Sequence, residues 1–161
     1  MPIPELETIV TKLNAEREKL VATLESTRED QRRQPIYESG WTLYEIAAHI
    51  ASAEKENIRF IRQTLEQDGA RHLPQGRVFS LDEWNAQAVG KRAAQSWAER
   101  MAEMREARQR TLDTIESVTP EQLTHRGTHA VWGEKSAEGM FKILYLHDIM
   151  HRGDVSRQLG S

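Results

Sequence analysis

The sequence predicts an all-α protein, folded as an antiparallel up-down four-helix bundle. Four long segments carry apolar residues at helical spacing, and Ser/Thr-x-x-Glu capping patterns open two of them. Alternating patterns typical of strands are nearly absent, so the helices must bury their apolar faces against one another. No repeat or linker divides the 161 residues, and we expect residues 1–161 to form a single domain.

The first helix is expected to run from Pro4 to about Arg32. Its apolar residues recur at steps of three, four or seven: Leu6, Val10, Leu13, Leu20 and Leu24. Arg17 occupies the apolar position in the middle of this series, so the stripe is imperfect there. Pro35 and Gly40 then bound a loop that separates the first helix from the next.

Thr42 and Glu45 form a capping box that opens a second helix, which is expected to end near Gln67. The residues of its inward stripe share helical spacing: Leu43, Ile46, Ile50, Ala53, Asn57 and Phe60 or Ile61. His49 lies at the edge of this stripe, so its imidazole is expected to face a neighbouring helix.

The rest of the chain predicts two further long helices. Residues 68–79 are expected to form a loop, and a capping box at Ser80 opens a helix from Leu81 to about Ser117, in which Gly90 marks a kink or a break. A short helical turn follows at residues 119–122, and residues 125–135 are expected to be irregular. Ser136 is the expected N-cap of a last helix that ends near Leu159.

Composition excludes several classes of function. The chain has 22 lysines and arginines against 25 aspartates and glutamates, which leaves no basic footprint for nucleic acid or an anionic membrane. It has no cysteine, so only imidazole and carboxylate side chains remain as metal ligands. No apolar run is long enough to span a membrane and the N-terminus does not resemble a signal peptide, so a cytoplasmic protein is expected.

Two histidines of the last segment stand out. His147 and His151 are four residues apart, which places both imidazoles on one face of a helix, between Leu144 and Val155 of the same apolar seam. Buried imidazoles without partners would destabilise the fold, whereas a divalent metal would take both lone pairs. His49 is the candidate for a third ligand.

Three runs of the sequence resemble the DinB-like superfamily, which includes the YfiT-type metal-dependent proteins. They are Gly40–Glu54 around His49, Leu81–Arg92, and His147–Val155 with the histidine pair. The resemblance implies a four-helix bundle, often a homodimer, with a divalent transition metal held by His49, His147 and His151. Members of the family are associated with nickel, zinc or iron, and with hydrolase, isomerase or thiol-dependent transferase activity.

Three neutral imidazoles would leave open positions on a metal, where water or a low-molecular-weight thiol could be activated. Asp154 follows His151 by three residues and is expected to orient its ring, and Trp132 is the candidate for a pocket wall. No carboxylate is placed as a general base, because Glu45 serves the capping box and Asp148 leaves the helix about 100° from the direction of the histidine before it.

Three functions therefore remain open. The first is a metal-dependent hydrolase or thiol-dependent transferase that acts on a small molecule. The second is a non-catalytic metal-binding or stress-response protein, a helical dimer whose metal is structural or vestigial, and the third is a dimeric scaffold with an empty histidine site. The remaining candidates have plain structural interpretations. His125 and His129 are expected to be loop residues, with a position in the lining of the site as the alternative. His72 is expected to be exposed, Glu54 to be surface or structural, and Trp41, Trp84 and Trp97 to be core or interface residues.

Overall fold

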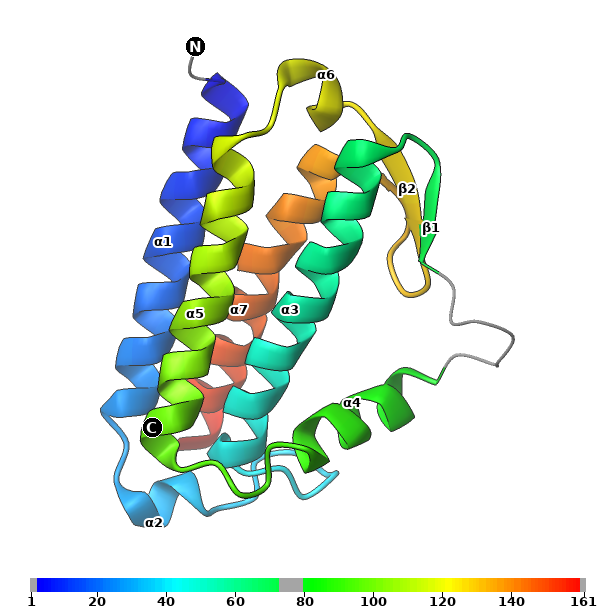
Figure 1. The fold of residues 1–161 in the computed structure, drawn as a ribbon. Coiled ribbons are helices and arrows are strands. Elements are labelled where there is room, and N and C mark those ends of the chain that lie inside the picture. The colour runs from blue at the N-terminus through cyan, green and yellow to red at the C-terminus, as the bar shows by residue number, and fades with distance from the viewer. Residues whose placement is uncertain (1–2, 73–79, 160–161) are drawn as a thin grey trace.

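Four long helices pack side by side in the computed structural model, which describes residues 3–72 and 80–159 (Figure 1). They are α1 (Pro4–Glu25), α3 (Leu43–Glu66), α5 (Trp97–Glu116) and α7 (Ala137–Leu159). Three short helices lie in the connections: α2 (Glu29–Arg32), α4 (Leu81–Gly90) and α6 (Pro120–Leu123). The predicted all-α four-helix bundle is confirmed, and no described helix is long and apolar enough to cross a membrane.

The directions of the helices differ from a simple up-down order. The Arg100 guanidinium donates to the Tyr44 carbonyl near the start of α5 and α3, and Arg62 donates to Thr114 near their ends. These two helices are therefore parallel, whereas α1 and α7 run the opposite way (Figure 1). The connection that includes α4 brings the chain back to the end of the bundle at which α3 begins.

The predicted first helix, Pro4 to Arg32, is interrupted. α1 ends at Glu25, and the hydroxyls of Ser26 and Thr27 donate to carbonyls of the last turn. Such side-chain bonds compete with continuation of a helix. The chain turns there and starts again as the single-turn α2.

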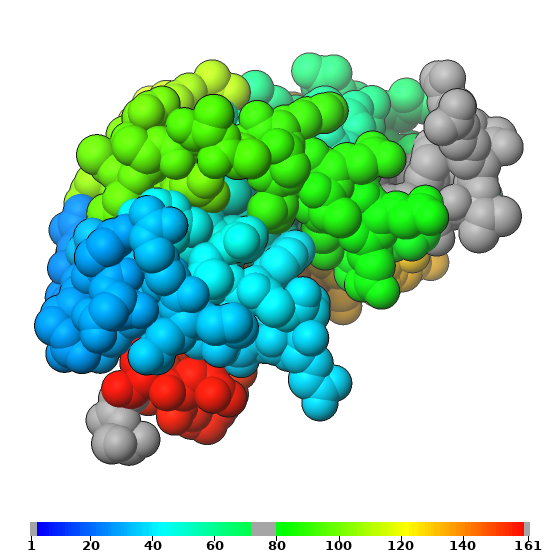
Figure 2. Space-filling view, turned by 90° about the horizontal axis from the view of Figure 1, so that it is seen from below, coloured from blue at the N-terminus to red at the C-terminus, as the bar shows by residue number. Residues whose placement is uncertain are grey.

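The predicted third helix is broken after Gly90 rather than kinked. Ser96 and Glu99 form a capping box that starts α5 afresh at Trp97. α4 therefore does not belong to the bundle: it packs against α3 and projects to one side, as the view from below shows (Figure 2). Residues of α4, Trp84 and Asn85 among them, line the pocket described below.

The loop expected over residues 68–79 and the irregular structure expected over residues 125–135 were wrong where short strands form, and residues 73–79 lie outside the described part of the chain. β1 (Ala70–His72), β2 (Arg126–His129) and β3 (Gly133–Ser136) form a small sheet in the order β1-β2-β3, with β1 parallel and β3 antiparallel to β2. Gly127 allows β2 to approach α3, since a Cβ there would lie 2.6 Å from Thr64 Oγ1. Ser136 ends β3, and its Oγ accepts a bond from the Gly139 amide at 3.1 Å, as expected of a cap.

Each long helix contributes one charged residue to a buried network of four, Arg17, Glu54, Arg108 and Asp148, which we call the charge network. Its four ion pairs have N···O distances of 2.7–3.0 Å, and its side chains are at most 6% exposed. Two positive and two negative charges balance, which such burial requires. Arg17 thus fills the gap in the apolar stripe of α1, and Glu54 is a structural residue.

Candidate metal centre

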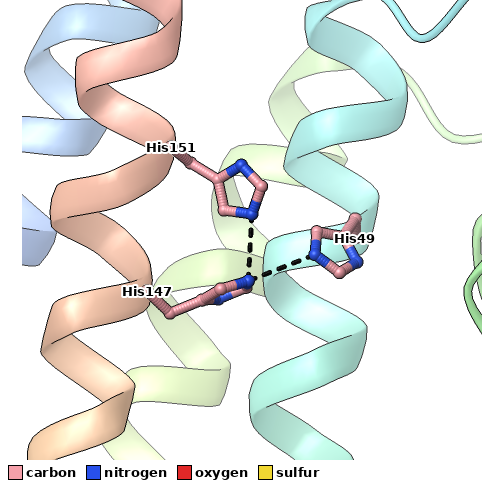
Figure 3. Close-up of side chains that lie close together, drawn as sticks. All are labelled: His49, His147 and His151. Atoms are coloured by element: carbon pink, nitrogen blue, oxygen red, sulfur yellow. Dashed lines mark hydrogen bonds between the residues drawn. The ribbon is translucent and has the colours of Figure 1, made fainter. Parts of the chain in front are cut away.

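Three histidine side chains converge between α3 and α7 (Figure 3). The Nε2 atom of His147 lies 3.2 Å from Nε2 of His49 and 2.9 Å from Nε2 of His151. One ligand atom from each residue lies within 4.8 Å of the other two. The four-residue spacing on α7 puts two rings on one helix face, and α3 presents the third toward them.

This donor set fits a divalent metal. Metal–nitrogen bonds of about 2.0–2.1 Å at angles near 90–110° place ligand nitrogens about 2.9–3.4 Å apart, close to the two distances above. Hydrogen bonds alone satisfy the cluster poorly, because Nε2 of His147 approaches both other rings and carries at most one hydrogen. Imidazole nitrogens suit zinc, nickel and iron alike.

Burial favours the neutral form of all three imidazoles, which is the form that binds a metal. Burial, followed by the adjacent His151, lowers the pKa of His49 to about 4, against a smaller raising effect of Asn85. Burial and the other two histidines hold the pKa of His147 well below its usual value. Burial also lowers the pKa of His151, although Asp154 and Asp148 oppose the shift.

The Tyr37 hydroxyl, from the loop before α3, determines which nitrogen of His151 carries hydrogen. It donates to Asp154 Oδ2 at 2.6 Å and lies 2.9 Å from Nδ1 of His151. Its one hydrogen is used on the carboxylate, so it accepts from Nδ1–H and leaves Nε2 with a lone pair for a metal. The direct contact expected between Asp154 and His151 is thus replaced by a relay through Tyr37.

Asp148 does not act in this site. It is 1% exposed and faces α1 and α5, where Arg17 and Arg108 bind its carboxylate in the charge network. Residues His147 and Asp148 thus point in different directions from α7, as their neighbouring positions on a helix require. The charge network binds the residue next to His147 and so holds this turn of α7 in place.

A pocket of about 750 Å³ opens beside the histidines. Its lining includes aromatic and polar side chains, among them Tyr37, Trp41, Asn57, Trp84, Asn85, His129 and Trp132. Its volume is in the range of cavities that bind small organic molecules. The three histidines lie within its lining, so a ligand in the pocket would meet the metal centre.

His129 belongs to the strand β2 and not to a loop, and it lines the pocket, which was the alternative expected for it. His129 is 6% exposed and stacks on Trp132, with ring centroids 3.9 Å apart and an interplanar angle of 13°. Trp132 lines the pocket, which is the position expected of it, but so do Trp41 and Trp84, which were expected in core or interface positions. His125, by contrast, is half-buried and bonds the Thr64 carbonyl.

Sequence reasoning missed Tyr37 altogether, because an isolated loop tyrosine carries no periodic signal. His129 gave a weak signal: it ends the short run Arg126–His129, whose alternation of outward and inward residues is visible only once a strand is assumed. The expectation that His72 is exposed falls on a side chain outside the described residues.

Three imidazoles in the wall of an aromatic pocket, held by two helices of a four-helix bundle, define a class of helical proteins with a candidate metal centre. A sequence profile described as the DinB superfamily matches residues 4–155, so the chain belongs to this superfamily. The resemblance found in the three sequence runs is thereby confirmed.

Solved structures with the same fold are distant in sequence. YfiT from Bacillus subtilis, described as a probable metal-dependent hydrolase with an unusual four-helix bundle topology, is 17% identical with a TM-score of 0.72, covering 99% of this chain and 90% of its own. A mutant of a mycothiol-dependent maleylpyruvate isomerase is 12% identical with a TM-score of 0.72, covering 96% of this chain and 61% of its own.

The colibactin self-resistance protein ClbS, solved in complex with a double-stranded DNA, is 11% identical with a TM-score of 0.76, covering 96% of this chain and 94% of its own. At these identities the likeness shows the fold alone. No curated protein sequence matches the chain.

Proposed function

We propose that this protein is a metal-dependent enzyme that acts on a small molecule, either as a hydrolase or as a thiol-dependent transferase. The observation that carries the proposal is the meeting of three neutral imidazole nitrogens in the wall of a pocket of about 750 Å³. Three protein ligands leave coordination positions open, which distinguishes reactive sites from closed structural ones. Two relatives in fold, a probable metal-dependent hydrolase and a thiol-dependent isomerase, agree with this class of chemistry.

His49, His147 and His151 would hold the metal, which when bound would lower the pKa of a coordinated water or thiol. The protein's own residues prepare the site for this. The Tyr37 hydroxyl keeps hydrogen on Nδ1 of His151, so that Nε2 remains a ligand. A ligand seated against the aromatic walls would displace water from the pocket and so strengthen electrostatic interactions inside it.

A structural metal is the second candidate function, and the charge network argues against it. Ion pairs between all four long helices and two clusters of buried apolar residues hold the bundle together without any metal. A metal required for folding is typical of small domains that lack such a core. We therefore expect the chain to remain folded after metal removal.

Metal content tests the first step. Protein purified without a histidine tag is expected to hold about one metal per chain by elemental analysis, and the His147→Ala variant is expected to hold none. The matched control is His125→Ala, since that ring bonds the Thr64 carbonyl and is not in the cluster. Equal metal in the two variants would disprove the assignment of the ligands.

Two further measurements separate the functions. Melting in the presence and absence of a chelator is expected to show a modest stabilisation by mass action, whereas unfolding on chelation would support a structural metal. The metal-loaded protein is then assayed against esters, epoxides and activated halides, each with and without a thiol. Loss of turnover in His147→Ala supports catalysis, and silence across the panel contradicts it.

We also propose a homodimer, since the family resemblance implies one. Three exposed apolar side chains at helical spacing on α7, Leu146, Ile149 and Met150, support a contact between copies of the chain. Light scattering on the wild type and on Leu146→Glu tests it: a dimer that the variant dissociates agrees with the proposal, and a monomeric wild type contradicts it.

A further inference from the structure

Aromatic side chains dominate the walls of the pocket. Three of the four tryptophans in the sequence line it, namely Trp41, Trp84 and Trp132, and all three are only half-buried. Trp41 packs against His49 with ring centroids 5.3 Å apart, which puts an aromatic surface beside the metal centre. A cavity lined by several half-exposed tryptophans is typical of a ligand-binding site, since each ring offers a large apolar face to a ligand.

Asn57 supplies the pocket with a hydrogen-bond donor. Nδ1 of His129 accepts from the backbone amides of Val131 and Trp132 at 3.0 and 3.2 Å, so the hydrogen of this ring is on Nε2. Nε2–H donates to Asn57 Oδ1 at 3.2 Å. Because its oxygen is engaged by His129, Asn57 presents N–H groups to a ligand and selects for an acceptor.

The position of Asn57 also determines how a ligand must lie. It follows His49 by two helical turns, which separates the two side chains by about 12 Å along α3. Both line the same pocket, one at the metal centre and the other beside the stacked pair of His129 and Trp132. A single ligand that reaches both is therefore elongated.

Without a metal, the described part of the lining offers an anion no cationic side chain. The described lining residues include two carboxylates, Asp82 and Glu56, of which Glu56 is paired with Arg59, and they include no lysine or arginine. In the metal-free pocket, a ligand carboxylate would lose its hydration without gaining an ion pair from the described lining residues. Uncharged ligands incur no such cost.

We infer that the pocket takes an uncharged, elongated molecule with an aromatic group and a hydrogen-bond acceptor, the ring held by the tryptophan walls and the acceptor by Asn57. The inference rests on the proposed function in one respect, namely that the end of the molecule opposite Asn57 is the one that reacts. An ester, amide, ketone or ether of an aromatic compound meets this description. A charged carboxylate or phosphate does not.

Three naphthalene probes of the same size test the inference in calorimetric titrations of the full-length protein, as purified and after metal removal. 2-Acetylnaphthalene has the ring and an uncharged acceptor, 2-ethylnaphthalene lacks the acceptor, and 2-naphthoate carries a charge. In metal-free protein we expect the ketone to bind roughly three- to tenfold more tightly than the hydrocarbon, because one hydrogen bond is added. We expect the naphthoate to bind at least about tenfold more weakly than the ketone.

Two variants assign the contacts, and a third variant serves as the control. Asn57→Asp keeps the oxygen that accepts from His129 but removes the N–H donors, so it should abolish the preference for the ketone over the hydrocarbon. Trp132→Leu should weaken both neutral probes by roughly three- to tenfold. Trp97→Leu, which alters the tryptophan that packs on Tyr44 away from the pocket, should change neither.

Each outcome decides between the two proposals. Equal affinity for the three probes, tighter binding of naphthoate to metal-free protein, or no binding at all would overturn the inference. Stoichiometric metal without probe binding would overturn it alone and leave the proposed metal centre intact. Probe binding with the expected order but without metal would support the inference and contradict the proposed function.

Discussion

Neutralising one member of the charge network should destabilise the bundle far more than neutralising a charged residue on the surface. Glu54 Oε1 accepts from Arg108 and Thr111, and Oε2 accepts from Arg17. Glu54→Gln leaves two buried guanidinium groups facing the single carboxylate of Asp148. Removing one partner of a buried ion pair costs about 3–5 kcal/mol, and we expect about 3 kcal/mol because glutamine keeps one oxygen acceptor.

The assay is urea unfolding followed by circular dichroism, with melting as a second measurement. For a chain of this length, about 3 kcal/mol corresponds to a melting temperature roughly 6–12 °C lower. Glu106→Gln is the matched control: Glu106 pairs with Arg110 on the surface of α5, and both side chains are more than half exposed. Such a pair contributes about 0–1 kcal/mol.

A double variant tests whether charge balance is the cause. Arg17→Met alone leaves two carboxylates against one guanidinium, whereas Arg17→Met with Glu54→Gln leaves the balanced pair of Arg108 and Asp148. The double variant should therefore be destabilised by less than the sum of the single ones, with a coupling of about 1–3 kcal/mol. Strict additivity, or a Glu54→Gln cost no larger than that of Glu106→Gln, would refute the reasoning.

Three further predictions follow from the site and the sheet. Tyr37→Phe should weaken metal binding about 10- to 100-fold in a competition with a chelating dye, because the hydroxyl that orients the ring of His151 is lost. Tyr44→Phe is the control and should not weaken it, since the Tyr44 hydroxyl bonds a surface glutamate. The free energy of unfolding of the metal-free protein should fall as the pH is lowered from about 6.5 to about 4. In this window the His49 imidazole takes up a proton in the unfolded chain, where its pKa is about 6.5, but not in the folded protein, where its pKa is about 4. A urea midpoint that stays constant across this window would contradict the shift. Gly127→Ala should cost about 1–3 kcal/mol in urea unfolding, since its Cβ would meet a hydroxyl at 2.6 Å, whereas Gly90→Ala, with nothing within 4 Å, should stay within about 0.5 kcal/mol.

The long helices were predictable because burial on one face imposes a period on the sequence. The cap at Thr42 and the inward stripe of α3 are examples. The crossover between α3 and α5 was not predictable in this way, because helix periodicity carries no information about direction. The capping box at Ser96 was the local sign of the break, and it was overlooked in favour of one long helix.

The short strands escaped prediction for a different reason. β1 has three residues and pairs with β2, which lies more than fifty residues further along the chain. A strand of that length has too few alternating positions to stand out, and its stability comes from the partner rather than from local preference. The position of His129 on a buried strand depended on that pairing.

At the candidate metal centre, the sequence predicted which three histidines would meet and the structure supplied what surrounds them. Helical spacing sufficed for His147 and His151. Tyr37 contacts His151, and Arg17 binds Asp148 in the charge network; both pairs are more than a hundred residues apart in the chain. No local sequence pattern predicts such contacts. Arg17 was the exception, because the sequence shows it as the one charged residue within an apolar series.

The candidate ligands and the surfaces that would select a substrate come from different kinds of chain segment. His49, His147 and His151 are part of bundle helices whose register the charge network holds, whereas Trp41, Trp84 and Trp132 belong to the loop before α3, the detached α4 and the β2–β3 turn. Evolution, or an engineer, could therefore exchange these peripheral pieces to change what enters the cavity while the three imidazoles keep their places. This architecture therefore allows the ligand preference of the pocket to diverge while the candidate metal centre stays unchanged.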